Sequence, residues 1–135
     1  MLQNRSIPSC TVIPELAYSN IGEAIDWLCD HFGFTLRVRI ADHRAQLNVG
    51  NGAVVLTELR EGGTNDFAHS LIVRVDDVDL HYARSCERGA RILREPASFP
   101  YGERQYTTID LGGHVWTFTQ SIADVASEDW GGTTA

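Results

Sequence analysis

The sequence predicts an α+β fold made of two βαβββ modules, and two observations carry this prediction. Local signals for a strand, a helix and three further strands occur twice in the same order along the 135 residues. In each half, the polar residue that caps the expected helix lies 13 positions before the glycine that ends it, Asn20 before Gly33 and Asp76 before Gly89. A repeat of two half-size modules fits within one ordinary domain.

The first expected helix has signals at both ends. Asn20, with Glu23 three residues later, resembles a capping box, and Gly33 is typical of the left-handed residue that follows a helix. Between these ends, apolar residues recur at helical spacing: Ile21, Ala24, Ile25, Leu28 and Phe32. A strand over residues 11–18 is expected to precede this helix.

The remainder of the first half reads as a three-stranded meander. Short alternating or β-branched runs, separated by turn-like residues, predict strands at residues 34–40, 45–49 and 53–59. Residues 60–66 are the most loop-like stretch of the interior. We therefore expect the joint between the two halves there.

The second half repeats the order. A strand over residues 70–75, a cap at Asp76, a helix over residues 78–88 and a stop at Gly89 are expected. Strand-like runs follow at residues 91–94, 106–109 and 115–120, with a loop at residues 95–102 and a tail, 122–135, that we expect to be mobile.

These elements predict one domain with half-modules over about residues 11–60 and 69–121. Each helix would cover one face of its small sheet. A curved mixed sheet would then surround a cleft with its other faces, and a ligand would bind there. A ferredoxin-like α+β sandwich without a pocket has the same periodicity and is the alternative.

Composition and charge exclude several classes of partner. The net charge is −7 and the isoelectric point is about 5.1, so the summed field repels nucleic acid and anionic membranes and favours cationic ligands. The three cysteines, Cys10, Cys29 and Cys86, form no pair with the spacing of a zinc clip or a redox motif. With no signal-peptide stretch and no apolar run of spanning length, we expect a cytoplasmic protein.

Three stretches resemble one family in their order along the chain: IPELAYSNIGEAIDWLCDHFGF, SLIVRVDDVD and YGERQYTTIDLGGHVWTF. Together they resemble the vicinal oxygen chelate superfamily of glyoxalases, bleomycin resistance proteins and extradiol dioxygenases. The resemblance implies the fold predicted above. It also implies that the metal-dependent members hold a divalent ion on four side chains, one from the first and one from the last strand of each module.

The four positions that the resemblance assigns to metal ligands are Ile13, Leu56, Ser70 and Thr117. These side chains lack the carboxylate, imidazole or thiolate donors that divalent ions need. His69 lies next to one position, but neighbouring strand residues point to opposite faces, so it does not restore a site. We therefore expect no metal and no other cofactor.

Strand alternation from those positions predicts the residues that line the cleft. Glu15 and Glu58, each two residues beyond an assigned position, would place two carboxylates there, unless both reach solvent at strand ends. Trp116 and Phe118 have the opposite parity to Thr117 and are expected in the core. The histidines His31, His43, His81 and His114 are expected on solvated helix surfaces or turns.

Aromatic residues around the expected second-half loop predict a wall for a flat ligand: Phe99, Tyr101 and Tyr106. With Glu15, Glu58, Ser70 and Thr117 they form the predicted ligand-binding set. No nucleophile motif or phosphate-binding loop is visible in the sequence.

The sequence and the resemblance together favour a metal-free binding protein over an enzyme. The expected function is sequestration of a planar or cationic small molecule, such as an antibiotic or other secondary metabolite, by a homodimer of the bleomycin-resistance type. One alternative is a lyase, isomerase or dioxygenase that uses a divalent metal. Another is an interaction module whose cleft is filled.

Overall fold

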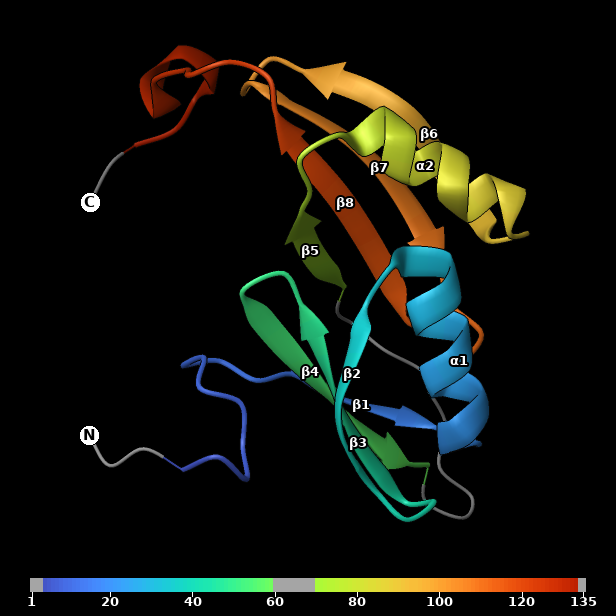
Figure 1. Cartoon of the computed structure of the whole chain (residues 1–135). Coiled ribbons are helices and arrows are strands. Elements are labelled where there is room, and N and C mark those ends of the chain that lie inside the picture. The colour runs from blue at the N-terminus through green and yellow to red at the C-terminus, as the bar shows by residue number, and fades with distance from the viewer. Residues whose placement is uncertain (1–3, 60–69, 134–135) are drawn as a thin grey trace. The chain divides into compact units, whose positions relative to one another are not determined.

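The computed structural model describes residues 4–59 and 70–133, and the order βαβββ occurs twice within them (Figure 1). The predicted fold class is confirmed. The expected joint at residues 60–66 and His69 lie outside the described residues. The elements are β1 (Glu15–Tyr18), α1 (Ile21–Phe32), β2 (Thr35–Ile40), β3 (Arg44–Val49), β4 (Gly52–Glu58), β5 (Leu71–Arg74), α2 (Val78–Glu87), β6 (Arg91–Phe99), β7 (Glu103–Ile109), β8 (Val115–Ser121) and the 3-10 turn η1 (Ser127–Trp130).

The described chain forms two compact units. Unit one contains β1 to β4 and α1, together with residues 111–114 from the turn between β7 and β8. Unit two contains β5 to β8, α2 and η1.

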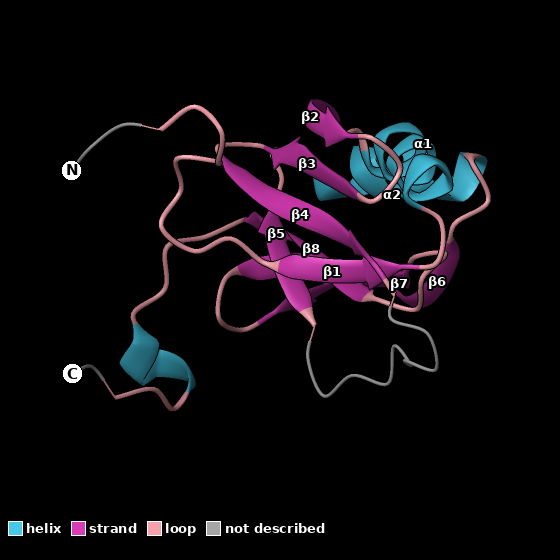
Figure 2. Ribbon diagram, turned by 90° about the horizontal axis from the view of Figure 1, so that it is seen from below, coloured by secondary structure: helices cyan, strands magenta, loops and turns pink. Residues whose placement is uncertain are grey.

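The sheet of unit one has the strand order β1-β4-β3-β2, which can be followed in Figure 2. Strand β1 runs parallel to β4, and the other neighbours are antiparallel. Leu16 pairs with Leu56, which also pairs with Ala45, so these three side chains share one sheet face. All three are buried, on the face that α1 covers. This face and α1 form the core of the unit.

Helix α1 has the ends that the sequence predicts. The Asn20 side chain accepts a hydrogen bond from the Glu23 N–H at 2.9 Å. Gly33 has a φ of 77° and donates its N–H to Cys29 O at 3.1 Å. The buried residues of the helix are those of the predicted apolar stripe: Ile21, Ala24, Ile25, Leu28 and Phe32.

The other face of this sheet carries the N-terminal segment. Gln46, only 4% exposed, donates its side-chain amide to Ser6 O at 2.9 Å, and Arg37 donates to Arg5 O at 2.9 Å.

The strand expected at residues 11–18 is shorter than predicted and begins at Glu15. Pro14 contributes only its carbonyl to the ladder, as acceptor from Val55 N–H, because proline has no N–H to donate.

Residues 111–114 pack closely in unit one. A Cβ on Gly112 would lie 2.6 Å from Tyr18 Cδ1, so only glycine fits at this contact. His114 Nε2 lies 2.8 Å from Ala17 O, and its ring centroid lies 4.8 Å from that of Tyr18. The expectation that His114 is solvated was wrong, since the residue is 1% exposed.

The sheet of unit two repeats the arrangement, with the order β5-β8-β7-β6 and β5 parallel to β8. Tyr106 pairs with Phe118, and Thr108 pairs with Trp116. All four side chains are buried, and α2 contacts the strands that carry them. The prediction that Trp116 and Phe118 belong to the core is confirmed.

Helix α2 begins at Val78 as predicted, but its N-cap lies one residue later than expected. The N-cap is Asp77, not Asp76, because the Asp77 carboxylate accepts the Leu80 N–H at 3.0 Å. The helix ends at Glu87, with Arg88 as its C-cap, and Gly89 follows with a φ of 83°. The predicted first residue and the glycine stop are therefore correct, whereas the predicted cap is off by one residue and the helix ends one residue before the predicted Arg88.

The loop expected at residues 95–102 was wrong for most of its length. Strand β6 continues to Phe99, across from Glu103 in β7. Its register shifts on both sides of Arg94, and the second shift spans Pro96. Such irregularities accommodate a proline that cannot donate to the ladder.

The start of the C-terminal tail is bound to the β6–β7 turn. Gly102, at a φ of 84°, accepts at its carbonyl from Ile122 N–H at 2.8 Å and Ala123 N–H at 3.3 Å. A Cβ on Gly102 would lie 2.5 Å from Ala123 O. The expected mobile tail thus has specific contacts along its described residues 122–133.

Among the helices that the structure describes, none is long and apolar enough to cross a membrane.

Replacing Gly89 by alanine is expected to lower the free energy of unfolding by about 1 kcal/mol, because the left-handed backbone strains an L side chain. Among the described residues, no atom beyond the two chain neighbours lies within 4 Å of the added Cβ, so the effect reports on the backbone. Urea denaturation measures it. Gly52→Ala is the control, because its Cβ would meet only an ordinary contact with Val49 O at 3.4 Å. Equal midpoints for Gly89→Ala and wild type would contradict the assignment.

Candidate functional site

The sheet of unit two has a face opposite to α2, here called the open face. Thr107 pairs with Thr117, and Gln105 pairs with Thr119. Glu103 has Ser121 on one side and Phe99 on the other. Because side chains alternate along each strand, these residues all point away from the helix-covered core. The open face comprises Ile72, Arg74, Arg94, Ala97, Phe99, Glu103, Gln105, Thr107, Thr117, Thr119 and Ser121.

Polar side chains of the open face are joined by hydrogen bonds. Thr119 donates its hydroxyl to Glu103 Oε1 at 2.8 Å and accepts the side-chain amide of Gln105 at 3.1 Å. The hydroxyls of Thr107 and Thr117 lie 2.9 Å apart. Such mutual bonds hold the donors and acceptors in fixed orientations, as a recognition surface requires.

Glu103 is the carboxylate of this face. A hydrogen bond from Ser121 lowers the pKa of Glu103, and a second bond from Thr119 and the nearby Arg74 guanidinium lower it further, against the opposing effect of desolvation. Glu103 is therefore ionised at neutral pH. Its charge is held in place by Ser121, Thr119 and Arg74, and a donor or cation of a ligand would add to these partners.

One end of the open face carries an aromatic cluster, defined as Phe99, Tyr101 and Trp130. The rings of Phe99 and Tyr101 are nearly parallel, at 4°, with centroids 5.3 Å apart. Trp130 lies against Tyr101 with a centroid distance of 5.3 Å. Tyr101 also donates its hydroxyl to Gln105 Oε1 at 3.2 Å, which joins the cluster to the polar row.

The structure places four predicted residues on or beside this face. Phe99 and Thr117 belong to it, and Tyr101 adjoins it through Gln105. Ser70 is exposed and immediately precedes β5. It lies two residues before Ile72, which pairs with Thr117, so its position has the same strand alternation as the open face. The sequence missed Glu103, Gln105 and Trp130, although the alternation that selected Thr117 would have found the first two once β7 was known to begin at Glu103.

Tyr106, a member of the predicted ligand-binding set, does not lie on the open face. It lies on the helix side of the sheet and is 0% exposed. Its hydroxyl lies 2.6 Å from His81 Nδ1 and 2.8 Å from Ser85 Oγ, both on α2. The Tyr106 hydroxyl therefore links α2 to its sheet through hydrogen bonds. His81 is correspondingly half-buried, in contrast to the expected solvated histidine.

Glu15 and Glu58 do not share a face, in contrast to the prediction. Glu15 pairs with Val55, whereas Glu58 pairs with Tyr18, so their side chains point to opposite sides of the sheet. Both residues are exposed, and Glu15 forms an ion pair with Arg44 at 2.9 Å. A register error of one residue in β4 caused the wrong assignment.

The same error applies to Leu56, one of the four positions compared with metal ligands. Leu56 is buried beneath α1, and the β4 residues of the opposite face are Val55 and Thr57. Neither is a carboxylate, imidazole or thiolate, nor are Ile13, Ser70 and Thr117. Among residues 4–59 and 70–133, no group of three His, Cys, Asp or Glu side chains could hold a metal ion. The residues present do not fit the family's divalent ion.

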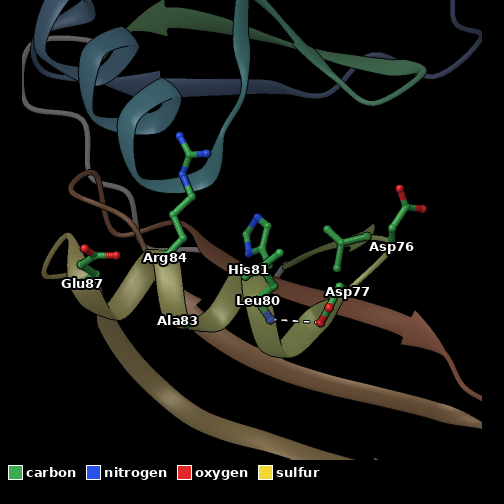
Figure 3. A pocket seen from close by; sticks show the side chains of 8 residues that line it. Asp76, Asp77, Leu80, His81, Ala83, Arg84 and Glu87 are labelled. Atoms are coloured by element: carbon green, nitrogen blue, oxygen red, sulfur yellow. Dashed lines mark hydrogen bonds between the residues drawn. The ribbon is translucent and has the colours of Figure 1, made fainter.

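Unit two also has a hollow of about 520 Å³ on the surface of α2 (Figure 3). Two of its polar groups already serve the helix, since Asp77 caps it and His81 contacts Tyr106. Asp77 and His81 are therefore already engaged in holding α2 in place. Its lining residues are Val75, Asp76, Asp77, Leu80, His81, Ala83, Arg84 and Glu87.

Comparison with known proteins gives one family. Residues 7–118 match the model of the Glyoxalase/Bleomycin resistance protein/Dioxygenase superfamily. TioX from Micromonospora sp. ML1 is 37% identical, with 87% of this chain and 100% of that chain covered and a TM-score of 0.71. A glyoxalase/bleomycin resistance protein from Streptomyces sp. CB03234 is 26% identical, with 80% and 97% covered and a TM-score of 0.67. Among curated proteins, none matches the chain significantly.

Tyr106→Phe is expected to destabilise the protein by about 1 to 3 kcal/mol at neutral pH, because it removes a buried hydroxyl from His81 and Ser85. Urea denaturation measures the loss. Tyr101→Phe removes a half-buried hydroxyl bonded to Gln105 and should cost less. Equal losses in the two variants would contradict the structural role of Tyr106.

Stability should also depend on Tyr106 at alkaline pH. Burial raises the pKa of the Tyr106 hydroxyl, against the lowering effect of its hydrogen bond with Ser85. The unfolded chain then ionises first, at pH about 10, so the stability from the neutral hydroxyl is lost as pH rises above that value. The free energy of unfolding, measured between neutral and strongly alkaline pH, should fall less steeply in Tyr106→Phe. Parallel profiles would refute the prediction.

Proposed function

Because the chain belongs to the Glyoxalase/Bleomycin resistance protein/Dioxygenase superfamily, we propose that it is a binding protein of the resistance type, which sequesters a small planar, cationic molecule without a metal. An antibiotic or another secondary metabolite is the expected ligand class. The observation that carries the proposal is the open face of unit two, where an aromatic cluster adjoins a hydrogen-bonded polar row that includes an ionised carboxylate.

The two parts of this surface suit the two features of such a ligand. Aromatic rings contribute about 0.5–1.5 kcal/mol per stacked pair beyond their buried area, so Phe99 and Tyr101 favour a flat ring system. Glu103 favours a cationic or donor-bearing group, and the net charge of −7 attracts cations over longer range. Thr117 and Thr107 supply hydroxyls for further orientation.

The residues at the metal-ligand positions, more than the relatives, support the resistance-type role over the enzymatic one. The Streptomyces sp. CB03234 structure is described as a glyoxalase/bleomycin resistance protein, at 26% identity, which names both classes. In this chain, the positions that correspond to metal ligands in the superfamily's enzymes hold aliphatic and hydroxyl side chains. A metal-dependent lyase, isomerase or dioxygenase would need donors that these positions do not supply.

The proposed assembly is a homodimer. In unit two, Ile72 on the edge strand β5 and Leu93 on the other edge strand β6 are exposed large apolar side chains. Edge strands with exposed apolar residues are usually covered by a partner, and a second copy is the simplest one. Sedimentation at micromolar concentration should therefore give twice the 15.0 kDa chain mass. A stable monomer would contradict the dimer and leave the binding proposal intact.

Binding is tested by a thermal-shift screen of antibiotics and other flat cationic compounds against the purified protein. A ligand at about 100 times its dissociation constant should stabilise the fold by roughly 2.7 kcal/mol. For a cationic hit, Glu103→Gln should weaken binding by about tenfold or more, measured by calorimetry at low and moderate salt. Glu58→Gln, in unit one, is the matched control and should leave the affinity unchanged.

Two results would overturn this proposal. One is stoichiometric zinc, nickel, iron or manganese in protein purified without chelator, which would favour the metal-dependent alternative. The other is a cationic hit whose affinity is unchanged in both Glu103→Gln and Tyr101→Leu, which would remove the open face from binding.

A further inference from the structure

Trp130 is the outermost member of the aromatic cluster and comes from the C-terminal segment. It is 48% exposed, although its ring packs against Tyr101. The two rings are tilted by 54°, and a half-exposed tryptophan beside a second ring can stack on a flat molecule at little entropic cost. The rest of the cluster comes from the end of β6 and the turn that follows it.

The segment that carries Trp130, here called the strap, comprises residues 122–133 and is hydrogen-bonded to the sheet at its start. Gly102 accepts the N–H groups of Ile122 and Ala123, so the start of the strap is fixed beside Tyr101. At its far end, Gly132 N–H bonds Ser127 O at 2.7 Å and closes the turn that presents Trp130. Figure 1 shows the strap beyond the end of β8, at the β6–β7 turn.

The strap is acidic next to Trp130, and at this end of the open face Glu103 lies near Arg74. Glu128 and Asp129 directly precede Trp130, and Glu103 lies beside Phe99 on the sheet. A cation that lies over the face of a tryptophan is attracted by its ring, more strongly than by other aromatic rings. A flat cationic ring system therefore matches both the aromatic and the acidic groups at this end of the sheet.

We propose that Trp130 is a ligand-contacting residue that makes the site selective for flat aromatic cations, a role that rests on the proposed function. In the free protein, Trp130 packs on Tyr101. When a flat cation binds, it inserts between these two rings. One face of the cation lies on Tyr101. The strap rotates about its attachment to Gly102, so that Trp130 covers the other face of the cation.

The probe for this proposal is 9-aminoacridine, a flat fluorescent cation at neutral pH, titrated into the full-length protein. Trp130→Ala is expected to weaken binding by about fivefold to tenfold, and Trp130→Phe by less, because a ring remains. A chain that ends at Val125 should resemble Trp130→Ala. The matched control is Trp27→Ala, which removes a half-buried tryptophan of α1 that stacks on His31. Its affinity should equal that of wild type.

A second readout separates contact from a merely structural role. If the probe lies against Trp130, it should quench tryptophan emission in wild type and in Trp27→Phe, and the quenching should be much smaller in Trp130→Phe. Gly102→Ala retains Trp130 but displaces the strap, because the added Cβ would lie 2.5 Å from Ala123 O. Its affinity should fall as in Trp130→Ala.

The outcomes distinguish this proposal from the function on which it rests. If Tyr101→Leu loses affinity while Trp130→Ala and the shortened chain bind as wild type does, the open face is the site and the role of Trp130 is refuted. If wild type does not bind 9-aminoacridine at millimolar concentration, the selectivity for flat aromatic cations is refuted. The wider screen then decides the proposed function separately.

Discussion

The pairing of the first and last strands in each unit decides where every other side chain points. In unit two, β5 runs parallel to β8 in a register that sets Val73 beside Phe118 and Ile72 beside Thr117. Because alternate residues face opposite sides, this register sends Trp116 and Phe118 under α2 and Thr117 and Thr119 to the open face. A shift of one residue would bury the polar row and expose the aromatic core. The hydrophobic core and the candidate site are thus two consequences of one pairing.

The two units use their remaining sheet faces differently. In unit one, the N-terminal segment bonds to Gln46 and Arg37, so that face is occupied by the chain itself. In unit two, the strap is hydrogen-bonded to the β6–β7 turn and contacts Tyr101 through Trp130. The repeat therefore supplies two similar sheets, and the chain termini make them unequal. This asymmetry is why the candidate site lies in unit two.

Glycine is required where backbone segments approach each other closely. Gly112 lies against the Tyr18 ring, and Gly102 lies against Ala123, at distances that exclude a Cβ. The first contact places residues 111–114 in unit one, and the second fixes the start of the strap. These contacts fix the position of the chain more specifically than apolar burial does. The hydrophobic effect is non-directional, whereas a close approach of two segments is possible in one geometry.

The sequence by itself determined the order of elements, the helix ends at Asn20, Gly33 and Gly89, and the buried stripe of α1, because these depend on residues a few positions apart. It also identified Phe99, Tyr101 and Thr117 as candidates. Only the tertiary structure decided which strand residues share a face, since strand register depends on pairing between distant segments. That is why Glu58, Leu56 and Tyr106 were misplaced and why Trp130, beyond the repeat, was not connected with Tyr101.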